Sequence, residues 1–249
     1  MIAVFVNCAT ILVGCVIGLF FAKRIRPDVT DAIQLACGLV SFVMGVQMAF
    51  RYQNVVYLAL ALILGGIVGT LLDIDGKILR FGRFLERVFM KGGSARPSVA
   101  GDGTGARAQK NFAYAFLNAS VLFCVGAMAI VGSFKAGIEH DYSIIFLKSV
   151  LDGFVSIGFA VAMGVGTAFS VISVFAYQGA LTALAVLIAP SVSDQLLAEL
   201  TGSGGALIVL IGINLMGLKK VKTANYVPAV LFSVAFVLAE PFVRRLLHF

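Results

Sequence analysis

Gly38-Leu-Val-Ser-Phe-Val-Met-Gly45-Val46-Gln47-Met48 returns later in the chain as Gly205-Ala-Leu-Ile-Val-Leu-Ile-Gly212-Ile213-Asn214-Leu215. Both stretches read glycine, six residues, glycine, a β-branched residue, a carboxamide, and then Met or Leu. A match of this kind indicates an internal repeat. In a membrane protein, two copies of opposite orientation are a common basis for transport, because either half can open.

The flanks of the two stretches match as well. Upstream, Arg26-Pro27-Asp28-Val29-Thr30-Asp31 corresponds to Ala189-Pro190-Ser191-Val192-Ser193-Asp194. Downstream, Asn54-Val55-Val56 corresponds to Asn225-Tyr226-Val227, so the copies differ by short loop insertions. The alternative is chance similarity between helices rich in glycine and valine, since apolar sequence of low complexity generates false repeats.

The composition is that of a membrane protein. Hydrophobic residues make up 60% of the chain and charged residues 12%, far from the averages of soluble proteins. Continuous apolar runs of bilayer-spanning length recur throughout, and they do not alternate as β-barrel strands do. We therefore predict an all-α polytopic protein of about eight transmembrane helices. The spans are placed near 2–22, 32–50, 55–72, 112–134, 143–166, 168–189, 203–218 and 226–243.

The net charge of +7 is concentrated in three clusters. The first follows the first span, the second lies between the third and fourth spans, and the third follows the seventh. Their members are Lys23, Arg24 and Arg26; Lys77, Arg80, Arg83, Arg87, Lys91, Arg96, Arg107 and Lys110; and Lys219, Lys220 and Lys222. With eight spans, all three clusters fall on one side, which the positive-inside rule makes cytoplasmic, so both termini are predicted to be external. Arg244, Arg245 and His248 fall on the external side and count against this topology.

This topology divides the chain into four parts. Residues 1–72 form the first repeat, and residues 168–249 form the second, inverted repeat. A central helix pair occupies 112–167, and 73–111 carries a cytoplasmic amphipathic helix and a disordered linker. The first span has no basic segment before it and no cleavage site after it, so it is interpreted as a retained helix rather than a signal peptide.

The segment 77–89 places apolar and basic residues on opposite helix faces, which is typical of a helix lying on a membrane surface. Its partner would be a bilayer with anionic headgroups, and the alternative is a docking helix for another protein. The following stretch, 92–105, is rich in Gly, Ser, Pro and Ala and is predicted to be a disordered linker. The basic excess thus indicates lipid contact and orientation rather than binding of nucleic acid.

Asp152 is the strongest candidate for a functional residue. It lies nine residues into its span, about 13–14 Å along the helix and close to the membrane midplane. Lys148 is four residues earlier on the same face and can pair with it, and Ser149 and Ser156 lie nearby. A carboxylate at this depth indicates a functional site. The alternative is an ion pair that only holds this helix to its neighbours.

Other polar residues inside spans could line a path with Asp152, although each alone is typical of an interhelical hydrogen bond. They are Asn7, Thr10, Asn118, Ser120, Tyr177, Gln178 and Asn214. Gln47 and Asn214 stand out because the repeat maps one onto the other. Glu240, before Pro241, is predicted to end the last helix near the interface. The segment 202–205 could present open amides to an anion at a helix start.

Nothing in the chain indicates an enzyme, a metal site or a cofactor. Cys8, Cys15, Cys37 and Cys124 lie inside spans without a completing ligand set, so they are interpreted as packing residues. His140 and His248 are isolated. No hydrolase triad and no nucleotide-binding motif is present.

Three motifs carry a family resemblance: Leu122-Phe-Cys-Val-Gly-Ala-Met-Ala-Ile-Val-Gly-Ser133, Lys148-Ser-Val-Leu-Asp-Gly153 and Tyr177-Gln-Gly179. With Leu72-Asp73-Ile74-Asp75-Gly76, the chain resembles the bacterial YdfK/YqgA-like integral membrane proteins over its whole length. That family is of uncharacterised function, and its members are usually labelled as candidate transporters. The resemblance implies a bacterial inner-membrane protein and directs attention to positions that recur in the family. These are Asn7, Cys124, Ser133, Lys148, Ser149, Asp152, Ser156, Tyr177 and Gln178.

The function favoured at this stage is transport of a small solute or ion by alternating access, with Asp152 as the coupling or binding carboxylate and Lys148 as its charge partner. A channel lined by the same polar face is the first alternative. A membrane scaffold or sensor acting through the surface helix is the second. The substrate, the coupling ion and the oligomeric state, a homo-oligomer included, stay open.

The topology can be tested by labelling introduced cysteines in intact cells. Because the basic clusters set the orientation, a cysteine near Arg83 is expected to react only after the membrane is opened, whereas one beside Met1 should react from outside. External labelling near Arg83 would contradict the eight-span arrangement.

Overall fold

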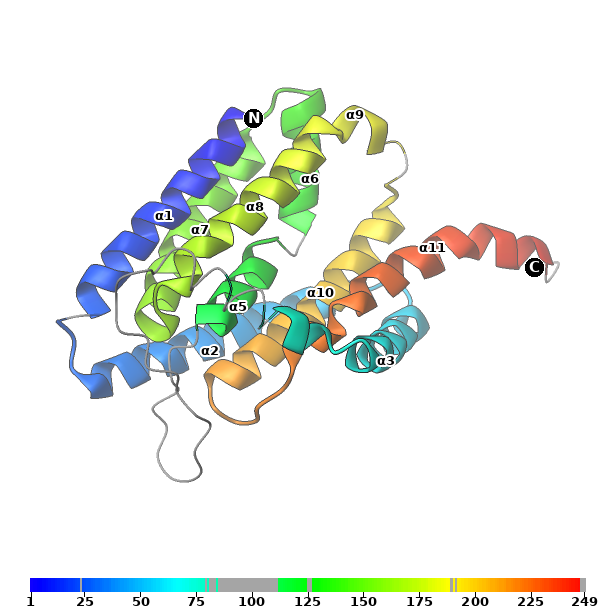
Figure 1. The fold of residues 1–249 in the computed structure, drawn as a ribbon. Coiled ribbons are helices and arrows are strands. Elements are labelled where there is room, and N and C mark those ends of the chain that lie inside the picture. The colour runs from blue at the N-terminus through cyan, green and yellow to red at the C-terminus, as the bar shows by residue number, and fades with distance from the viewer. Residues whose placement is uncertain are drawn as a thin grey trace.

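The computed structural model describes residues 1–22, 24–78, 80, 84, 112–124, 127–188, 190 and 192–246. Within these residues the chain is helical, with no strand. The longer helices are α1 (Ile2–Ala22), α2 (Pro27–Ala49), α3 (Val55–Leu71), α7 (Ser143–Met163), α8 (Gly166–Ala183), α10 (Asp194–Leu215) and α11 (Pro228–Leu246). The shorter ones are α5 (Phe112–Cys124), α6 (Ala127–Ile138), α9 (Ala185–Ile188) and the 3₁₀ helix η2 (Thr223–Tyr226). Figure 1 shows α1, α7 and α8 side by side, with α2 crossing beneath them and α3, α10 and α11 to one side.

In the described part of the chain, five helices are long and apolar enough to cross a membrane: α1, α2, α7, α10 and the segment that ends in α11. The α5–α6 pair adds a sixth if it counts as one bent span, and α3 is an apolar helix of 17 residues. The chain is therefore an all-α membrane protein with five to six candidate spans. Each of the eight predicted spans contains a helix, but α3 and α8 are not among the candidate spans.

Three details of the sequence prediction are wrong. The fourth span is not one helix, because α5 and α6 are bent by 60° at a break after Cys124. The seventh begins at Asp194 rather than near 203, because the Ser193 side chain accepts a hydrogen bond from Leu196 N and caps the helix there. Glu240 does not end the last helix, since α11 continues through Pro241 to Leu246. A proline is tolerated where membrane helices satisfy the freed carbonyl by other means.

The turn between the fifth and sixth predicted spans is short. α7 ends at Met163, and Gly164 has φ +90°, a conformation that a side chain at this position would strain. Thr167 Oγ1 then donates to Phe159 O at 3.3 Å, which fastens the start of α8 to the end of α7. This tight connection makes α7 and α8 neighbours of opposite direction.

α1 packs closely against α7 through two glycines. A Cβ on Gly14 would lie 2.3 Å from Gly153 O, and one on Gly18 would lie 2.4 Å from Ile157 O. Residue numbers rise together along this contact, so the two helices run parallel. In lipid, the hydrophobic effect does not drive helices together. Membrane helices therefore associate mainly through close packing, which small residues allow.

The repeated glycines meet each other. A Cβ on Gly205 would lie 2.8 Å from Gly45 O, and a Cβ on Gly212 would lie 2.8 Å from Gly38 O. The first glycine of each copy thus faces the second glycine of the other copy, and α2 and α10 cross in antiparallel directions. α3 and α11 form a second antiparallel pair, in which a Cβ on Gly65 would lie 2.4 Å from Ala229 N.

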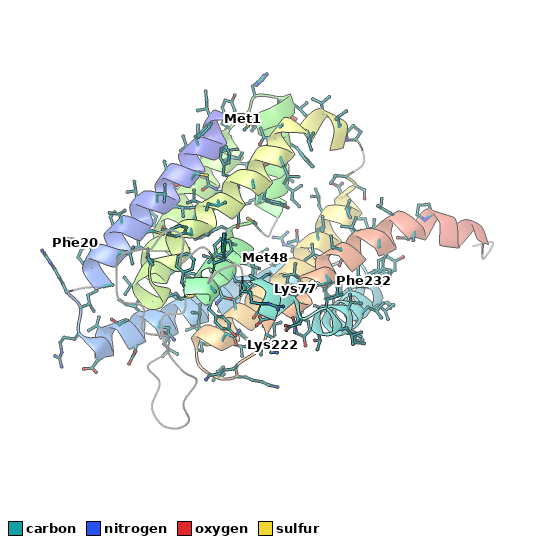
Figure 2. The ribbon with its side chains drawn as sticks, viewed as in Figure 1. Met1, Phe20, Met48, Lys77, Lys222 and Phe232 are labelled. Carbon is teal, nitrogen blue, oxygen red and sulfur yellow. The ribbon has the colours of Figure 1, made fainter. Side chains whose placement is uncertain are left out.

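The described members of the three basic clusters gather at the end of the molecule opposite Met1. Gln34 Nε2 donates to Leu215 O at 3.1 Å, which brings the start of α2, after Arg26, to the end of α10, before Lys219. Asp75 N donates to the Asn225 side chain at 2.9 Å, which places Lys77 near Lys222. Figure 2 shows Lys77 and Lys222 in the lower part of the molecule and Met1 at the top. Most of the predicted surface helix 77–89 and the whole predicted linker 92–105 lie outside the described residues.

The close crossing of α2 and α10 at their glycines predicts how a larger side chain there changes the stability of the protein. Gly205→Ala should lower the free energy of unfolding by about 2–3 kcal/mol, as overpacking does, because its Cβ would lie 2.3 Å from Ala49 N. Gly179→Ala on α8 is the control, since the nearest atom to its Cβ would be Met1 Cε at 3.7 Å. It should be neutral or stabilising. Thermal unfolding in detergent measures both, and equal stability of the two variants would contradict the packing.

Candidate functional site

Side chains from three helices form one buried polar network. On α7, Lys148 Nζ donates to Asp152 Oδ2 one turn further along. From α1, Asn7 Nδ2 donates to the same carboxylate oxygen at 3.2 Å and to Gln178 Oε1 on α8 at 2.9 Å. The sequence predicted all four residues as site candidates, and the fold brings them together.

The network is closed to solvent. Asn7 and Gln178 are 0% exposed, Lys148 is 6% exposed and Asp152 is 8% exposed. Burying two charges costs several kcal/mol per ion, and the ion pair together with the Asn7 hydrogen bond offsets part of that cost. The site formed by the buried carboxylate, its counter-ion and the amide donor is neutral overall. Its stability is the difference between two large energies, the cost of burying the charges and their attraction to each other. Small changes in its surroundings can therefore shift its protonation or its partners.

The four residues lie in the half of the bundle nearer Met1. Lys148 is five residues from the start of α7, Asn7 five from the start of α1, and Gln178 five from the end of α8. At the helical rise this is about 8 Å from those ends, whereas Asp152 reaches about 13–14 Å. The network therefore extends from near the middle of α7 toward the Met1 end.

The break between α5 and α6 adjoins this network. α5 ends at Cys124, and the Cys124 side chain lies within electrostatic reach of Lys148 and Asp152. A helix interrupted inside a bundle leaves carbonyl groups at the end of one half and N–H groups at the start of the other without intrahelical partners. Interrupted helices of this kind form ligand sites in many transporters.

Other predicted residues have structural partners. Ser149 Oγ donates to Ile145 O at 2.7 Å within α7, and Ser156 Oγ donates to Ile11 O at 3.2 Å and so joins α7 to α1. Asn118 Nδ2 contacts Met163 Sδ at 3.8 Å, and Tyr177 packs among apolar side chains that include Phe134. Ser149 and Ser156 lie within one turn of Asp152, whereas Asn118 lies beside the far end of α7, and among the described hydrogen bonds of these residues none joins the network.

Gln47 and Asn214, which the repeat relates, do not belong to this network. Gln47 is exposed near the end of α2. Asn214 closes the loop after α10, because its side chain accepts from Val221 N at 2.7 Å and donates to Thr223 Oγ1 at 2.9 Å. The segment 202–205 is also not a helix start, since it lies inside α10, where its amides are used by the helix.

Two acidic residues that the sequence analysis missed hold matched loops. Glu199, 0% exposed in α10, accepts from Gln53 N at 3.0 Å and from Asn54 N at 2.7 Å, just before α3. Asp75 is bonded to Ala224 N, just before α11. The repeat pairs Asn54 with Asn225, so an acidic residue anchors the corresponding loop in each copy. In the sequence, the position of these acidic residues beside predicted spans was the feature that could have identified them.

Asp75 lies beyond the end of α3, outside the spanning helices. Burial raises the pKa of its carboxyl above the usual value, whereas the hydrogen bond from Ala224 N and the nearby Lys222 ammonium lower it. Because Asp75 N also donates to the Asn225 side chain, this joint fastens the segment after α3 to the start of α11 through two hydrogen bonds.

All four cysteines pack in or against the main apolar cluster of the bundle. Cys8 and Cys15 belong to the main apolar cluster of the bundle, and both are free thiols. Among the described residues, no group of three or more His, Cys, Asp or Glu side chains is arranged to hold a metal ion.

Comparison with known proteins agrees with this architecture. The family model described as "Protein of unknown function (DUF554)" matches residues 2–238. The chain belongs to the DUF554 family. It is 26% identical over 238 residues to the uncharacterized membrane protein YdfK of Bacillus subtilis, covering 93% of this chain and 94% of YdfK. It is 25% identical over 230 residues to the uncharacterized protein YqgA of Escherichia coli, covering 92% and 93% of the two chains. No solved structure matches it.

This membership confirms the resemblance inferred from the motifs around Ser133, Asp152 and Gln178, and it places the DUF554 protein among membrane proteins. The family description and the names of both relatives leave function open. The buried network is therefore the feature of the molecule that indicates a function.

The ion pair predicts an asymmetry in stability. Lys148→Ala leaves the Asp152 carboxylate buried without its counter-ion and should cost about 3–5 kcal/mol. The double variant Lys148→Ala/Asp152→Asn removes both charges and should recover most of that loss. Lys135→Ala is the control, because Lys135 is only partly buried and its ion pairs with Glu139 at 3.9 Å and Asp141 at 3.8 Å lie near the surface, where ion pairs contribute little. Thermal unfolding in detergent measures all three, and a double variant no more stable than Lys148→Ala would contradict the pairing.

Proposed function

We propose that this DUF554 protein is a secondary transporter that moves a small solute or ion by alternating access, with Asp152 as its coupling carboxylate. The observation that carries the proposal is the buried network of Asn7, Lys148, Asp152 and Gln178, built by three helices beside an interrupted helix. Ionisable residues inside membrane helices are costly and are characteristic of ion and substrate pathways.

An inverted repeat supports the mechanism. In the proposal, α1, α2 and α3 correspond to α8, α10 and α11, and the eight helical segments each cross the bilayer. The reciprocal contacts of Gly38 with Gly212 and of Gly45 with Gly205 are those expected if a two-fold axis relates the copies. The helix directions also agree with the inverted topology of the proposal, since α1 runs parallel to α7 and antiparallel to α8. Two related halves can rock about such a crossing and open to either side.

The chemistry follows from the ion pair. While Asp152 is ionised, it holds the Lys148 ammonium, and the two charges cancel. A proton or a cation that takes the Asp152 carboxylate removes that partner, and Lys148 must then find another acceptor or move. Ion binding at Asp152 is therefore linked to rearrangement of α7 against α1 and α8. This linkage is the requirement for coupling one movement to another.

The apolar packing favours alternating access over an open channel. Away from Met1, the space between the helices is filled by a large apolar cluster that includes Phe123, Phe159 and Ile211. A channel needs a continuous wet path through that region, whereas a transporter needs a path to only one side at a time. A scaffold or sensor needs neither, and it would leave the buried network without a role beyond packing.

In this proposal the end of the molecule that carries Met1 is external, and the basic end faces the cytoplasm of a bacterium. The positive-inside rule supports this orientation, because the described members of the three basic clusters lie at one end. Anionic headgroups at that end would be the lipid partners of the basic residues, among them Lys77 and Lys222.

The transport proposal is tested in proteoliposomes loaded with a pH-sensitive dye and offered amino acids, organic acids, sugars and metal cations in turn. Asp152→Asn keeps the size and hydrogen bonding of the side chain but cannot ionise. It should fold and insert, yet lose any solute-driven proton or cation movement that the wild type shows. Gln47→Ala is the control, since Gln47 is exposed and remote from the network. Full transport by Asp152→Asn would remove this residue from the mechanism.

A further inference from the structure

Four buried side-chain atoms around the network have no hydrogen-bond partner among the described residues. They are Asn7 Oδ1, Ser133 Oγ, Gln178 Nε2 and Thr182 Oγ1. Three of these residues are 0% exposed, and Thr182 is 7% exposed. An unsatisfied buried polar atom costs about 1–3 kcal/mol, so a group of four at one place needs an explanation.

Two of the four residues lie along one face of α8. Gln178 meets Asn7 on α1, and Thr182 is one turn further along the same face, next to the helix end at Ala183. Asn7 Oδ1 adds an acceptor from α1 at the level of Gln178. Polar atoms thus continue from Asp152 past Gln178 toward the Met1 end.

Ser133 on α6 joins them. Its neighbour Gly132 packs on Ile145 of α7, and Gly137 packs on Thr182 O of α8. At about 100° per residue, Ser133 points between these two directions, toward the space that α1, α7 and α8 enclose. α6 runs parallel to α8, because Phe134 packs near Leu181 and Gly137 beside Thr182. Ser133, one turn before Gly137, therefore lies at the level of Gln178.

The apolar cover over these atoms is unequal at the two ends. Toward Met1 it consists of two small clusters, one of Ala3, Ala136 and Ile145 and one of Ile130, Phe134 and Ala185. On the other side lies the large cluster that contains Phe123, Phe159 and Ile211. Gln178, Ser133 and Thr182 therefore lie on the side of Asp152 where the apolar clusters are smaller.

We propose that the strip formed by Asn7, Ser133, Gln178 and Thr182 is a water-filled proton path that connects Asp152 with the compartment at the Met1 end. The inference rests on the proposed function, in which Asp152 is the coupling carboxylate. Its ligands are water and hydronium. The strip offers both donors and acceptors, and a buried water typically makes two to four hydrogen bonds with such groups.

Transfer of a proton from the strip to Asp152 conserves both atoms and charge. A hydronium in the strip donates one proton to the Asp152 carboxylate, which becomes a carboxylic acid, and the hydronium becomes water. The ammonium of Lys148 keeps its charge and loses its counter-ion. Among the described residues, the other titratable groups nearby are Cys124 at the end of α5, Cys8 on α1 and Tyr177 on α8. The four side chains of the strip are uncharged, so they conduct a proton without holding a competing ion.

Infrared spectroscopy on oriented proteoliposomes tests the path. Vesicles with the Met1 end outward are selected through a tag at Met1, and the carboxylic acid band of Asp152 is identified by its loss in Asp152→Asn. After acid is added outside, the double variant Ser133→Ala/Thr182→Val should protonate Asp152 at least roughly tenfold more slowly than wild type, because two links of the path are removed. Acid released inside the vesicles should act equally on both proteins.

Ser170→Ala is the matched control. Ser170 is a buried serine on the same helix, and its hydroxyl already donates to Thr167 O at 2.7 Å. This variant should protonate Asp152 at the wild-type rate. The double variant should unfold no earlier than wild type, because the deleted hydroxyls have no partner among the described residues.

The outcomes separate the two proposals. If the Asp152 band responds to outside acid equally fast in wild type and in the double variant, the path is wrong and the coupling role of Asp152 stands. If the double variant slows protonation from both compartments equally, the strip is not a path to the Met1 end. If the band responds from neither compartment in wild type, Asp152 does not exchange protons, and both proposals fail.

Discussion

The burial of Lys148 and Asp152 as a pair is the constraint on which the central bundle depends. Neither charge could be tolerated alone among apolar helices, so α7 must present both on one face, and α1 and α8 must supply the amides that complete the network. The parallel contact of α1 with α7 through Gly14 and Gly18 sets the distance at which Asn7 can reach the carboxylate. Packing and electrostatics are therefore satisfied by the same arrangement.

The second half of the structure depends on backbone contact rather than charge. α2 and α10 approach through Gly45 and Gly205 so closely that no side chain fits, and α3 and α11 repeat this through Gly65. Glu199 and Asp75 then hold the loops before α3 and α11 by accepting backbone hydrogen bonds. Rigid antiparallel pairs with anchored loops are suited to move as units beside a bundle that contains an ion pair and an interrupted helix. The transport proposal requires this combination of rigid helix pairs and a bundle that can rearrange.

Much of this was predictable because helix spacing and membrane burial are local properties. Lys148 and Asp152 pair at a separation of four residues in any helix, and Gly38 and Gly45 were visible as half of a repeat. The break after Cys124 was not predictable, because the sequence runs on as one apolar segment. The burial of Glu199 was missed for a related reason, since its helix begins at the Ser193 cap rather than where apolar residues become continuous. Gln47 was included through the repeat, but the repeat relates positions and not environments, and Gln47 is exposed while Asn214 closes a loop.

The sequence by itself determined the membrane class, the helical segments, the family resemblance, the internal match and the ion pair, because each follows from composition or from residues close together along the chain. Only the tertiary structure decided that Asn7 and Gln178 complete the site, that Ser133 and Thr182 lie beside it, and that the repeated glycines face each other across α2 and α10. The reason is physical. These contacts join residues more than a hundred positions apart or depend on how helices are rotated, and helix rotation is set by packing against neighbours rather than by local sequence.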